Sequence, residues 1–246
     1  MNMKSPDKTP ASTSNFEQKI AEQQREITSL KRKLAQFQST TDETPELDES
    51  DALDLLAIAS RFRDSVTGSH TRRIGRYAGV LAIALGWSES DAEMLEKAAP
   101  LHDTGKLGIP DNILRSTEKL TDAQWKIMRR HPKMGYDILS KGKSPLFALA
   151  AEIALNHHEC WDGSGYPSGK RGSDIPESAR ITIIVDVFDA LSTKRPYKEA
   201  WAIADAFDYI EEQSALMFDP SMVAIFRSIR PQITELWHQL NEKVID

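Results

Sequence analysis

Helical periodicity dominates the chain from Asp51 to its end. The segments DALDLLAIASRF, HTRRIGRYAGVLAIALG, LFALAAEIALNHH and EAWAIADAFDYIEEQ repeat apolar residues every three or four positions. That spacing places the apolar side chains on one face of a helix. The segment ARITIIVDVF contains β-branched residues and could locally form a strand, but its flanks and the lack of partner strands favour a helix. We therefore expect an all-α fold, with one helical domain over residues 51–246.

Several helix ends are also visible in the sequence. Gly86 follows an apolar helical repeat and is a plausible C-cap, because glycine readily adopts the left-handed conformation there. The segment SESDAEM offers serine N-caps followed by acidic residues in the first turn. Thr121 and Gln124 have the spacing of a capping box.

The first 50 residues follow a different pattern. Residues 1–14 are rich in Ser, Thr, Pro and Lys and are expected to be a disordered tail, and residues 39–50 form an acidic linker around Pro45. Between them, residues 15–38 place one side chain at each a and d position of a heptad repeat: Phe16, Ile20, Gln23, Ile27, Leu30, Leu34 and Phe37. This stripe predicts a parallel coiled-coil helix and hence a homodimer; a solvated helix lying on the main domain is the alternative.

Composition limits the classes of function. Of the 246 residues 40% are hydrophobic, which is enough for a core, and the formal charge of −6 argues against a binder of nucleic-acid polymers. A lone cysteine, Cys160, excludes an internal disulfide and suits a reducing compartment. The sequence has no signal-peptide core at its start and no apolar run near the roughly 18 residues that span a bilayer. We expect a cytoplasmic protein that does not enter the membrane.

Histidines and carboxylates suggest a metal site. A single histidine is more often structural, but these have acidic or histidine neighbours: His70, His102, His131, His157 and His158, with Asp103 and Asp186. Adjacent residues on a helix point about 100° apart, so Asp103 beside His102 can lie between two ions. By the same geometry, His157 can face one ion and His158 a second. Asp186 and Asp189 share one helical face and could instead be solvated.

The donor set indicates the kind of metal. Imidazoles with carboxylates, and no thiolate pattern, suit iron, manganese, nickel or zinc better than magnesium or calcium. Seven donors exceed the needs of one ion, and two bridged ions would use them all, as in enzymes that hydrolyse phosphate esters. Lys106 lies one turn after Asp103 and can meet a phosphate oxygen.

These motifs together resemble the HD-GYP domain, a subgroup of the HD metal-dependent phosphohydrolases. The resemblance runs from about Asp64 to about Asp219 and rests on HDTGKLGIPDNIL, the histidine before PKMGYDIL, HHECWDGSGYP and ARITIIVDVFDALSTKRPYK, in that order. It implies an HD-type helical bundle in a cytoplasm-facing bacterial protein. The implied activity is hydrolysis of cyclic di-GMP to linear pGpG, and often on to GMP.

The resemblance also implies roles for individual residues. The ligands of two metal ions, iron or manganese, would be His70, His102, Asp103, His131, His157, His158 and Asp186. Asp103 and Lys106 would be catalytic, with Lys106 on the scissile phosphate. Substrate would be held by Lys106, Gly165, Tyr166, Pro167, Asp189, Arg195 and Lys198. Without the motif, Arg195 and Lys198 would be assigned to a solvated turn.

One position departs from the family pattern. Members that hold three metals carry a glutamate four residues before the first ligand histidine, and this chain has Val66 there. Valine cannot coordinate, so two ions are expected. Three functions remain open: a cyclic di-GMP phosphodiesterase, a cyclic dinucleotide sensor that barely hydrolyses and signals to a partner protein through the stalk, and a phosphohydrolase of another cyclic dinucleotide.

Overall fold

The computed structural model describes residues 49–64, 68–194 and 199–241. The chain divides into two units, Met1–Asp48 and Glu49–Asp246, and every described residue belongs to the second. The predicted tail, the coiled-coil helix and nearly all of the linker therefore lie outside the described residues. Val66, Arg195 and Lys198 lie outside them as well.

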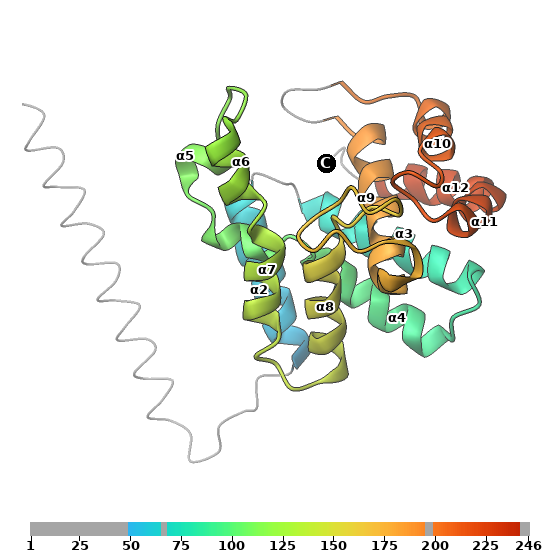
Figure 1. The fold of residues 1–246 in the computed structure, drawn as a ribbon. Coiled ribbons are helices and arrows are strands. Elements are labelled where there is room, and N and C mark those ends of the chain that lie inside the picture. The colour runs from blue at the N-terminus through green and yellow to red at the C-terminus, as the bar shows by residue number, and fades with distance from the viewer. Residues whose placement is uncertain (1–48, 65–67, 195–198, 242–246) are drawn as a thin grey trace, which may run out of the picture. The chain divides into compact units, whose positions relative to one another are not determined.

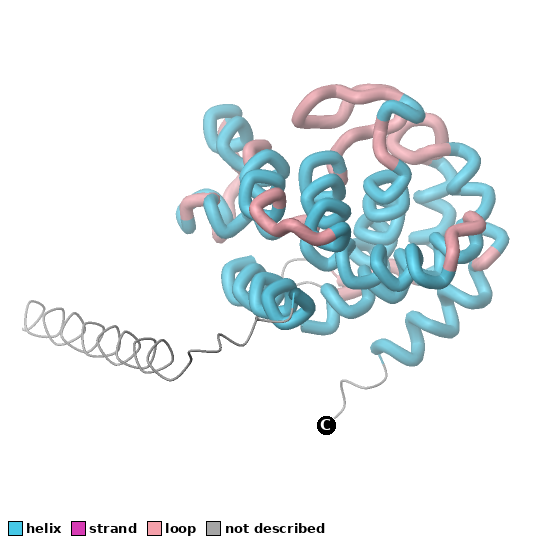
Figure 2. The backbone as a smooth tube through the Cα atoms, turned by 90° about the horizontal axis from the view of Figure 1, so that it is seen from below, coloured by secondary structure: helices cyan, strands magenta, loops and turns pink. Residues whose placement is uncertain are grey.

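Within these ranges the fold is entirely helical, as the periodicity predicts, and contains no strand (Figure 1). The α-helices are α2 (Glu49–Asp64), α3 (Gly68–Ala84), α4 (Glu89–Ala98), α5 (Asp111–Leu114), α6 (Asp122–Met128), α7 (His131–Leu139), α8 (Pro145–Asn156), α9 (Glu177–Ser192), α10 (Ile203–Glu212), α11 (Pro220–Ser228) and α12 (Arg230–Asn241). Short 3₁₀ turns are η1 (Ala99–Leu101), η2 (Thr104–Gly108) and η3 (Gly172–Asp174). Loops join these helices in Figure 2, the longest between α8 and α9.

The helix α9 lies at the centre of the domain. It packs against α3, α8, α10 and α11, and most of its side chains are buried. Phe188 on α9 contacts three aromatic rings, with centroid distances of 5.6 Å to Tyr77, 4.9 Å to Phe207 and 5.5 Å to Phe226. The β-branched residues of this segment are accommodated in a helix because burial on nearly all sides, rather than intrinsic propensity, decides its conformation.

The predicted helix ends are confirmed. Gly86 has φ +92°, and the Trp87 amide donates to the Ala82 carbonyl at 3.0 Å, the bond that closes a Schellman C-cap. Ser88 caps α4, and Thr121 forms a complete capping box with Gln124 at the start of α6. No helix of the described part of the chain is both long enough and apolar enough to cross a membrane.

Candidate metal centre

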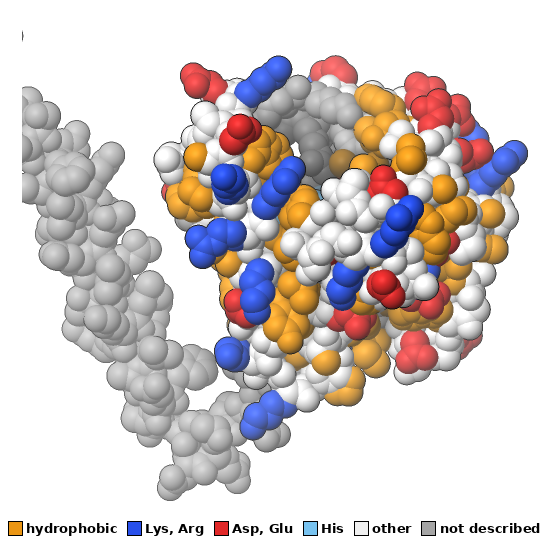
Figure 3. Space-filling view, in the orientation of Figure 1, with side chains coloured by type: hydrophobic (Ala, Val, Ile, Leu, Met, Phe, Trp, Pro, Cys, Tyr) orange, Lys and Arg blue, Asp and Glu red, His pale blue; other side chains and the backbone are white. Residues whose placement is uncertain are grey.

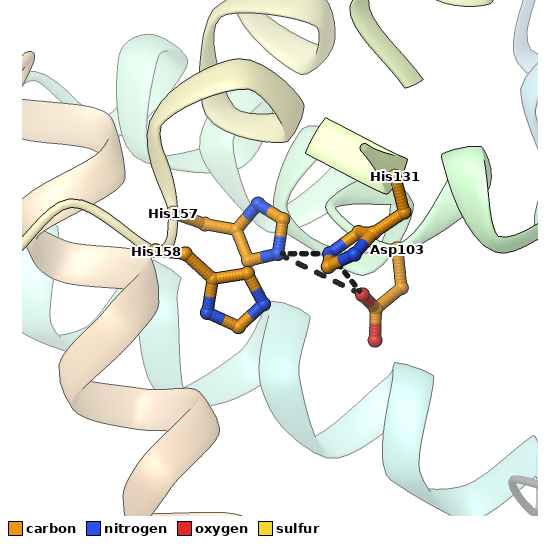
Figure 4. Close-up of side chains that lie close together, drawn as sticks. All are labelled: Asp103, His131, His157 and His158. Carbon is orange, nitrogen blue, oxygen red and sulfur yellow. Dashed lines mark hydrogen bonds and ion pairs between the residues drawn. The ribbon is translucent and has the colours of Figure 1, made fainter. Parts of the chain in front are cut away.

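The structure brings the seven predicted donors together from five parts of the fold. One cluster consists of Asp103, His131, His157 and His158, and the second of His70, His102 and Asp186. In each cluster the candidate ligand atoms lie within 4.8 Å of one another, which is close enough for a single ion to reach them all. Figure 4 shows the first cluster, in which the histidine rings face the Asp103 carboxylate.

Asp103 lies between the two clusters. Its Oδ2 is 3.3 Å from Nε2 of His102, and its Oδ1 is 3.4 Å from Nε2 of His131 and 3.6 Å from Nε2 of His157. One carboxylate oxygen thus faces each cluster. This is the geometry of a bridging ligand, and it matches the expectation that an acid beside His102 can lie between two ions.

Backbone carbonyls fix the orientation of three of the rings. In each ring Nδ1 lies within hydrogen-bonding distance of the carbonyl three residues earlier, at 2.8, 2.9 and 2.9 Å for His102, His131 and His157. A carbonyl can only accept, so Nδ1 carries a proton and Nε2 is the nitrogen that faces the cluster, with a free lone pair whenever the ring is neutral. Histidines that bind metal usually donate their other ring N–H to a carbonyl or carboxylate in this way.

A carboxylate performs the same task for His70. Its Nδ1 lies 2.6 Å from Oδ2 of Asp189, while Arg73 donates to Asp189 from Nε at 2.5 Å and from Nη2 at 3.0 Å. Burial opposes ionisation of Asp189, but the hydrogen bonds from His70 and Arg73 outweigh it and lower the pKa of this carboxyl. Nε2 of His70 is left facing Asp186, 3.8 Å away.

The expected substrate-holding role of Asp189 does not fit this geometry. Its side chain is 0% exposed, and both of its oxygens are engaged by His70 and Arg73. A carboxylate in this position orients a neighbouring imidazole and neutralises a buried guanidinium. Asp186, three residues earlier, has a quarter-exposed side chain and lies 3.8 Å from both His70 and His102.

The arrangement of the histidine pair also differs from the expectation. His157 and His158 were expected to diverge toward different ions, but both lie in the Asp103 cluster, with ring centroids 4.1 Å apart. The reason is that α8 ends at Asn156, so the two residues lie in a turn where the 100° helical rotation does not apply.

The electrostatics of the centre suit a cation. Among the described residues, Nε2 of His102 and Oδ1 of Asp103 are buried and make no hydrogen bond. Nε2 of His131 and Nε2 of His157 lie 3.3 Å apart, although both rings carry their proton on Nδ1 when neutral. Two lone pairs at this distance repel unless a positive charge lies near them.

Burial keeps part of the cluster ready to coordinate. It lowers the pKa of His131 to about 4 and moves the pKa of His158 well below its usual value. Burial would raise the pKa of Asp103, but the neighbouring Lys106 and His102 hold it well below its usual range. For His102, burial would lower the pKa, but the carboxylates of Asp103 and Asp186 raise it to about 9. Neutral imidazoles beside an ionised carboxylate are the forms that bind metal, so a divalent ion fits these residues and would displace a proton from His102.

The Gly165-Tyr166-Pro167 loop forms one wall of the Asp103 cluster. The Tyr166 ring stacks on His158 with centroids 4.7 Å apart and planes at 23°, and the Tyr166–Pro167 peptide is cis. A Cβ on Gly165 would lie 2.3 Å from the Cys160 amide nitrogen and 2.4 Å from the His158 carbonyl oxygen. Only glycine fits there, since real Cβ atoms do not approach backbone so closely.

Basic side chains flank this wall. The Arg129 guanidinium lies 5.3 Å from the centroid of the Tyr166 ring, and Lys106 Nζ pairs with Oδ2 of Asp103 at 2.7 Å. Lys126 on α6, Arg130 between α6 and α7, and Lys133 on α7 are exposed, where Figure 3 shows cationic side chains gathered. Cationic side chains therefore gather beside this wall of the Asp103 cluster, and their charge favours an anionic ligand.

Sequence reasoning missed two residues that shape the site. Glu159 is buried and accepts hydrogen bonds from the backbone amides of Ser168 at 2.8 Å and Lys170 at 3.0 Å, which closes the Gly165-Tyr166-Pro167 loop. Its position directly after the histidine pair is the sequence feature that could have identified Glu159 as part of the site. Arg73 lies three residues after His70 on α3, and this helical spacing could have identified it.

Comparisons with known proteins agree with the fold. A family model described as HD domain matches residues 54–222. The cyclic di-GMP phosphodiesterase response regulator RpfG of Xanthomonas campestris pv. campestris is 43% identical over 193 residues, covering 78% of this chain and 51% of the relative. The 3′3′-cGAMP-specific phosphodiesterase 2 of Vibrio cholerae is 45% identical over 170 residues, covering 69% of this chain and 33% of the relative.

A solved structure shares the same fold. The crystal structure of the cyclic GMP-AMP-specific phosphodiesterase V-cGAP3 of V. cholerae aligns with a TM-score of 0.60 at 17% identity, covering 78% of this chain and 50% of that one. The chain spans about half the length, or less, of each of these relatives.

Proposed function

We propose a function from one premise: this chain belongs to the HD domain family and is related to the HD-GYP cyclic di-GMP phosphodiesterases. On that basis it is a metal-dependent phosphodiesterase of cyclic dinucleotides. Its preferred substrate is cyclic di-GMP, which it opens to linear pGpG; a second hydrolysis of pGpG would give GMP. Its cofactors are two divalent ions, iron or manganese. The named activity of the 43%-identical relative supports this choice of substrate.

One observation carries the proposal: Asp103 directs one carboxylate oxygen toward each of two clusters, and His102, His131 and His157 present Nε2 to it. The metal ligands we assign are His70, His102, Asp103, His131, His157, His158 and Asp186. Two divalent cations held there supply an activated water and positive charge for the phosphate oxygens.

The chain's own side chains have distinct tasks. Asp103 stays ionised because Lys106 and His102 lower its pKa against the effect of burial. The Lys106 ammonium, 2.7 Å from Asp103, supplies a fixed cation for the charge that develops on the scissile phosphate. Tyr166 shields His158 and shapes the wall against which the dinucleotide lies. Arg195 and Lys198, outside the described residues, are proposed to hold substrate.

A second substrate is 3′3′-cGAMP. A relative with 45% identity over 170 residues is named as specific for that dinucleotide. Both molecules are cyclic dinucleotides with two phosphodiester linkages, and the metal centre contacts the linkage rather than the bases. The choice between them therefore depends on residues around the bases and not on the ligands.

The test is a substrate panel on metal-loaded protein. The full chain is loaded with Fe(II) or Mn(II) under reducing conditions and incubated with cyclic di-GMP, 3′3′-cGAMP and cyclic di-AMP, and the products are separated by chromatography. We expect pGpG as the product, with the highest kcat/KM for cyclic di-GMP, and the amount of GMP formed measures the second hydrolysis. If the fully metal-loaded protein bound these dinucleotides tightly but turned over none of the three, the protein would be a sensor of these messengers and not an enzyme.

A further inference from the structure

The helix α6 presents a tryptophan to solvent. Trp125 is 46% exposed, and its indole makes no hydrogen bond and no ring contact with any described residue. None of the seven residues of α6 is buried, so Trp125 does not anchor this helix on the domain core. A single exposed hydrophobic side chain is common, so Trp125 has meaning only together with its neighbour one turn later.

That neighbour is Arg129. Its amide donates to the Trp125 carbonyl at 2.9 Å, as in a helix, so both side chains leave the same face of α6. The Arg129 guanidinium lies 5.3 Å from the centroid of the Tyr166 ring. The side chain is exposed, and no carboxylate of the described residues pairs with it. An arginine that lies over an aromatic ring keeps N–H groups at the edge of its plane, where they can bind a ligand.

This contact places Arg129 close to the metal centre. The centroids of the Tyr166 and His158 rings are 4.7 Å apart, so the Arg129 guanidinium lies at most the sum of these two distances, 10.0 Å, from the His158 ring. A nucleotide spans a comparable distance from its phosphate to the outer edge of its base. The helix α6 runs toward the ligand His131, so Trp125 lies one turn, about 5.4 Å, farther out than Arg129.

Together the two side chains fit a guanine base. Guanine presents two acceptors on one edge, O6 and N7, and an arginine can donate to both at once. Adenine presents an amino donor in place of O6, and an arginine cannot donate to it. The indole of Trp125 is a flat surface on which a purine can stack. A phosphate could pair with Arg129 but would gain nothing from the tryptophan beside it, so the pair favours a base.

We propose that Trp125 and Arg129 form a guanine subsite for the cyclic dinucleotide, in which the base stacks on the indole and Arg129 donates to O6 and N7. This inference rests on the proposed function and adds to it the residues that select guanine over adenine. The two residues have different effects: Arg129 decides which base is bound, whereas Trp125 contributes alike to either purine.

Substitution of Arg129 tests the choice of base. The metal-loaded full chain is assayed for kcat/KM with cyclic di-GMP and for the inhibition constant of cyclic di-AMP as a competitor. Arg129→Met removes the donors and keeps the length of the side chain. It should lower kcat/KM for cyclic di-GMP by about tenfold or more and leave the inhibition constant of cyclic di-AMP within about twofold. An equal loss for both ligands, or no loss for either, would overturn the guanine subsite.

Two further variants complete the test. The matched control is Arg130→Met, because Arg130 is an exposed arginine at the next position, and it should leave the ratio of the two values unchanged. Trp125→Ala should weaken both ligands alike by about fivefold or more, and Trp125→Phe should restore most of that loss. Full activity of Trp125→Ala would contradict the stacked base. Thermal unfolding and metal analysis check that every variant keeps its fold and its metal.

The wild-type chain separates this inference from the proposed function. If it hydrolyses cyclic di-GMP and Arg129→Met keeps the ratio, the function stands and the subsite is wrong. If it turns over no dinucleotide, the phosphodiesterase assignment fails. The dissociation constants of cyclic di-GMP and cyclic di-AMP, measured by calorimetry on the same variants, then decide the subsite by the same ratios. If the metal-loaded wild-type chain binds neither dinucleotide, both proposals are overturned.

Discussion

Replacing Asp189 with asparagine tests whether this residue orients a ligand or holds substrate. The side chain is 0% exposed and accepts from His70 Nδ1 and Arg73 Nη2 through Oδ2, and from Arg73 Nε through Oδ1. An asparagine has one acceptor where aspartate has two. Whichever way the amide turns, its NH₂ group meets at least one of these donors, and the Arg73 charge loses its counter-ion.

The expected cost follows from these contacts. Removing one partner of a buried ion pair costs about 3–5 kcal/mol, and the isosteric amide keeps part of the bonding, so we expect a loss of about 3 kcal/mol in the free energy of unfolding. If the NH₂ group faces His70, the ring must accept at Nδ1, which moves its proton to Nε2. That nitrogen then has no lone pair for a metal, and outer-shell changes of this kind cost about 10–100-fold in metal affinity.

Two assays check the Asp189→Asn prediction. Urea unfolding in the presence of EDTA gives the stability of the metal-free protein, and competition with a chromophoric chelator gives the affinity for Mn(II). The control is Asp137→Asn, because Asp137 forms an exposed pair with Lys133 and should change neither value. A normal metal affinity combined with a raised KM would refute the orienting role and restore the substrate-holding one.

Three further substitutions have separate outcomes. Lys106→Met should lower kcat by about 100-fold or more while leaving two metals bound, because it removes a cation and no metal ligand. Turnover assays and metal analysis measure the two values. Gly165→Ala should abolish turnover and weaken metal binding, measured by turnover and metal analysis, because its Cβ would lie 2.3 Å from the Cys160 nitrogen and 2.4 Å from the carbonyl oxygen of the ligand His158; an active variant would contradict the assigned wall. Asp219 caps α11 and pairs with Arg180. Burial opposes ionisation of the Asp219 carboxyl, but Ser221 and Arg180 hold its pKa below the usual value. Its contribution to the free energy of unfolding is therefore fully present above about pH 4 and is lost as pH falls through the folded-state pKa. Asp219→Asn should therefore destabilise the protein by about 3 kcal/mol at pH 7 and by progressively less in acid, measured by urea unfolding across pH.

Local features of the fold were predictable from the sequence. Helix ends depend on a few neighbouring residues, so the Gly86 cap and the Thr121 capping box could be identified without tertiary information. The assignment of residues 179–188 to a helix required only their flanks and the lack of partner strands in the sequence. The spacing of histidines and acids likewise predicted a binuclear donor set, and the structure brings those residues into two clusters.

Tertiary features were not predictable in the same way. The partner of Asp189 is Arg73, 116 residues earlier, and a 3.6-residue period cannot reveal such a pairing. The shared cluster of His157 and His158 depends on α8 ending at Asn156, a boundary that an apolar repeat locates only to within a turn. The position of Glu159 directly after the histidine pair marks it as near the site, but its hydrogen bonds to the Ser168 and Lys170 amides depend on the folding of a loop that this position does not predict.

The measurement that tests the account most directly is the magnetic state of the manganese-loaded protein. EDTA-treated full chain is titrated with Mn(II) under anaerobic conditions and followed by electron paramagnetic resonance and metal analysis. Because Asp103 directs one oxygen toward each cluster, the account predicts two ions per chain with an exchange-coupled spectrum. Asp103→Ala should abolish the coupling. One ion per chain at saturation, or two ions with uncoupled spectra, would contradict a bridged metal pair.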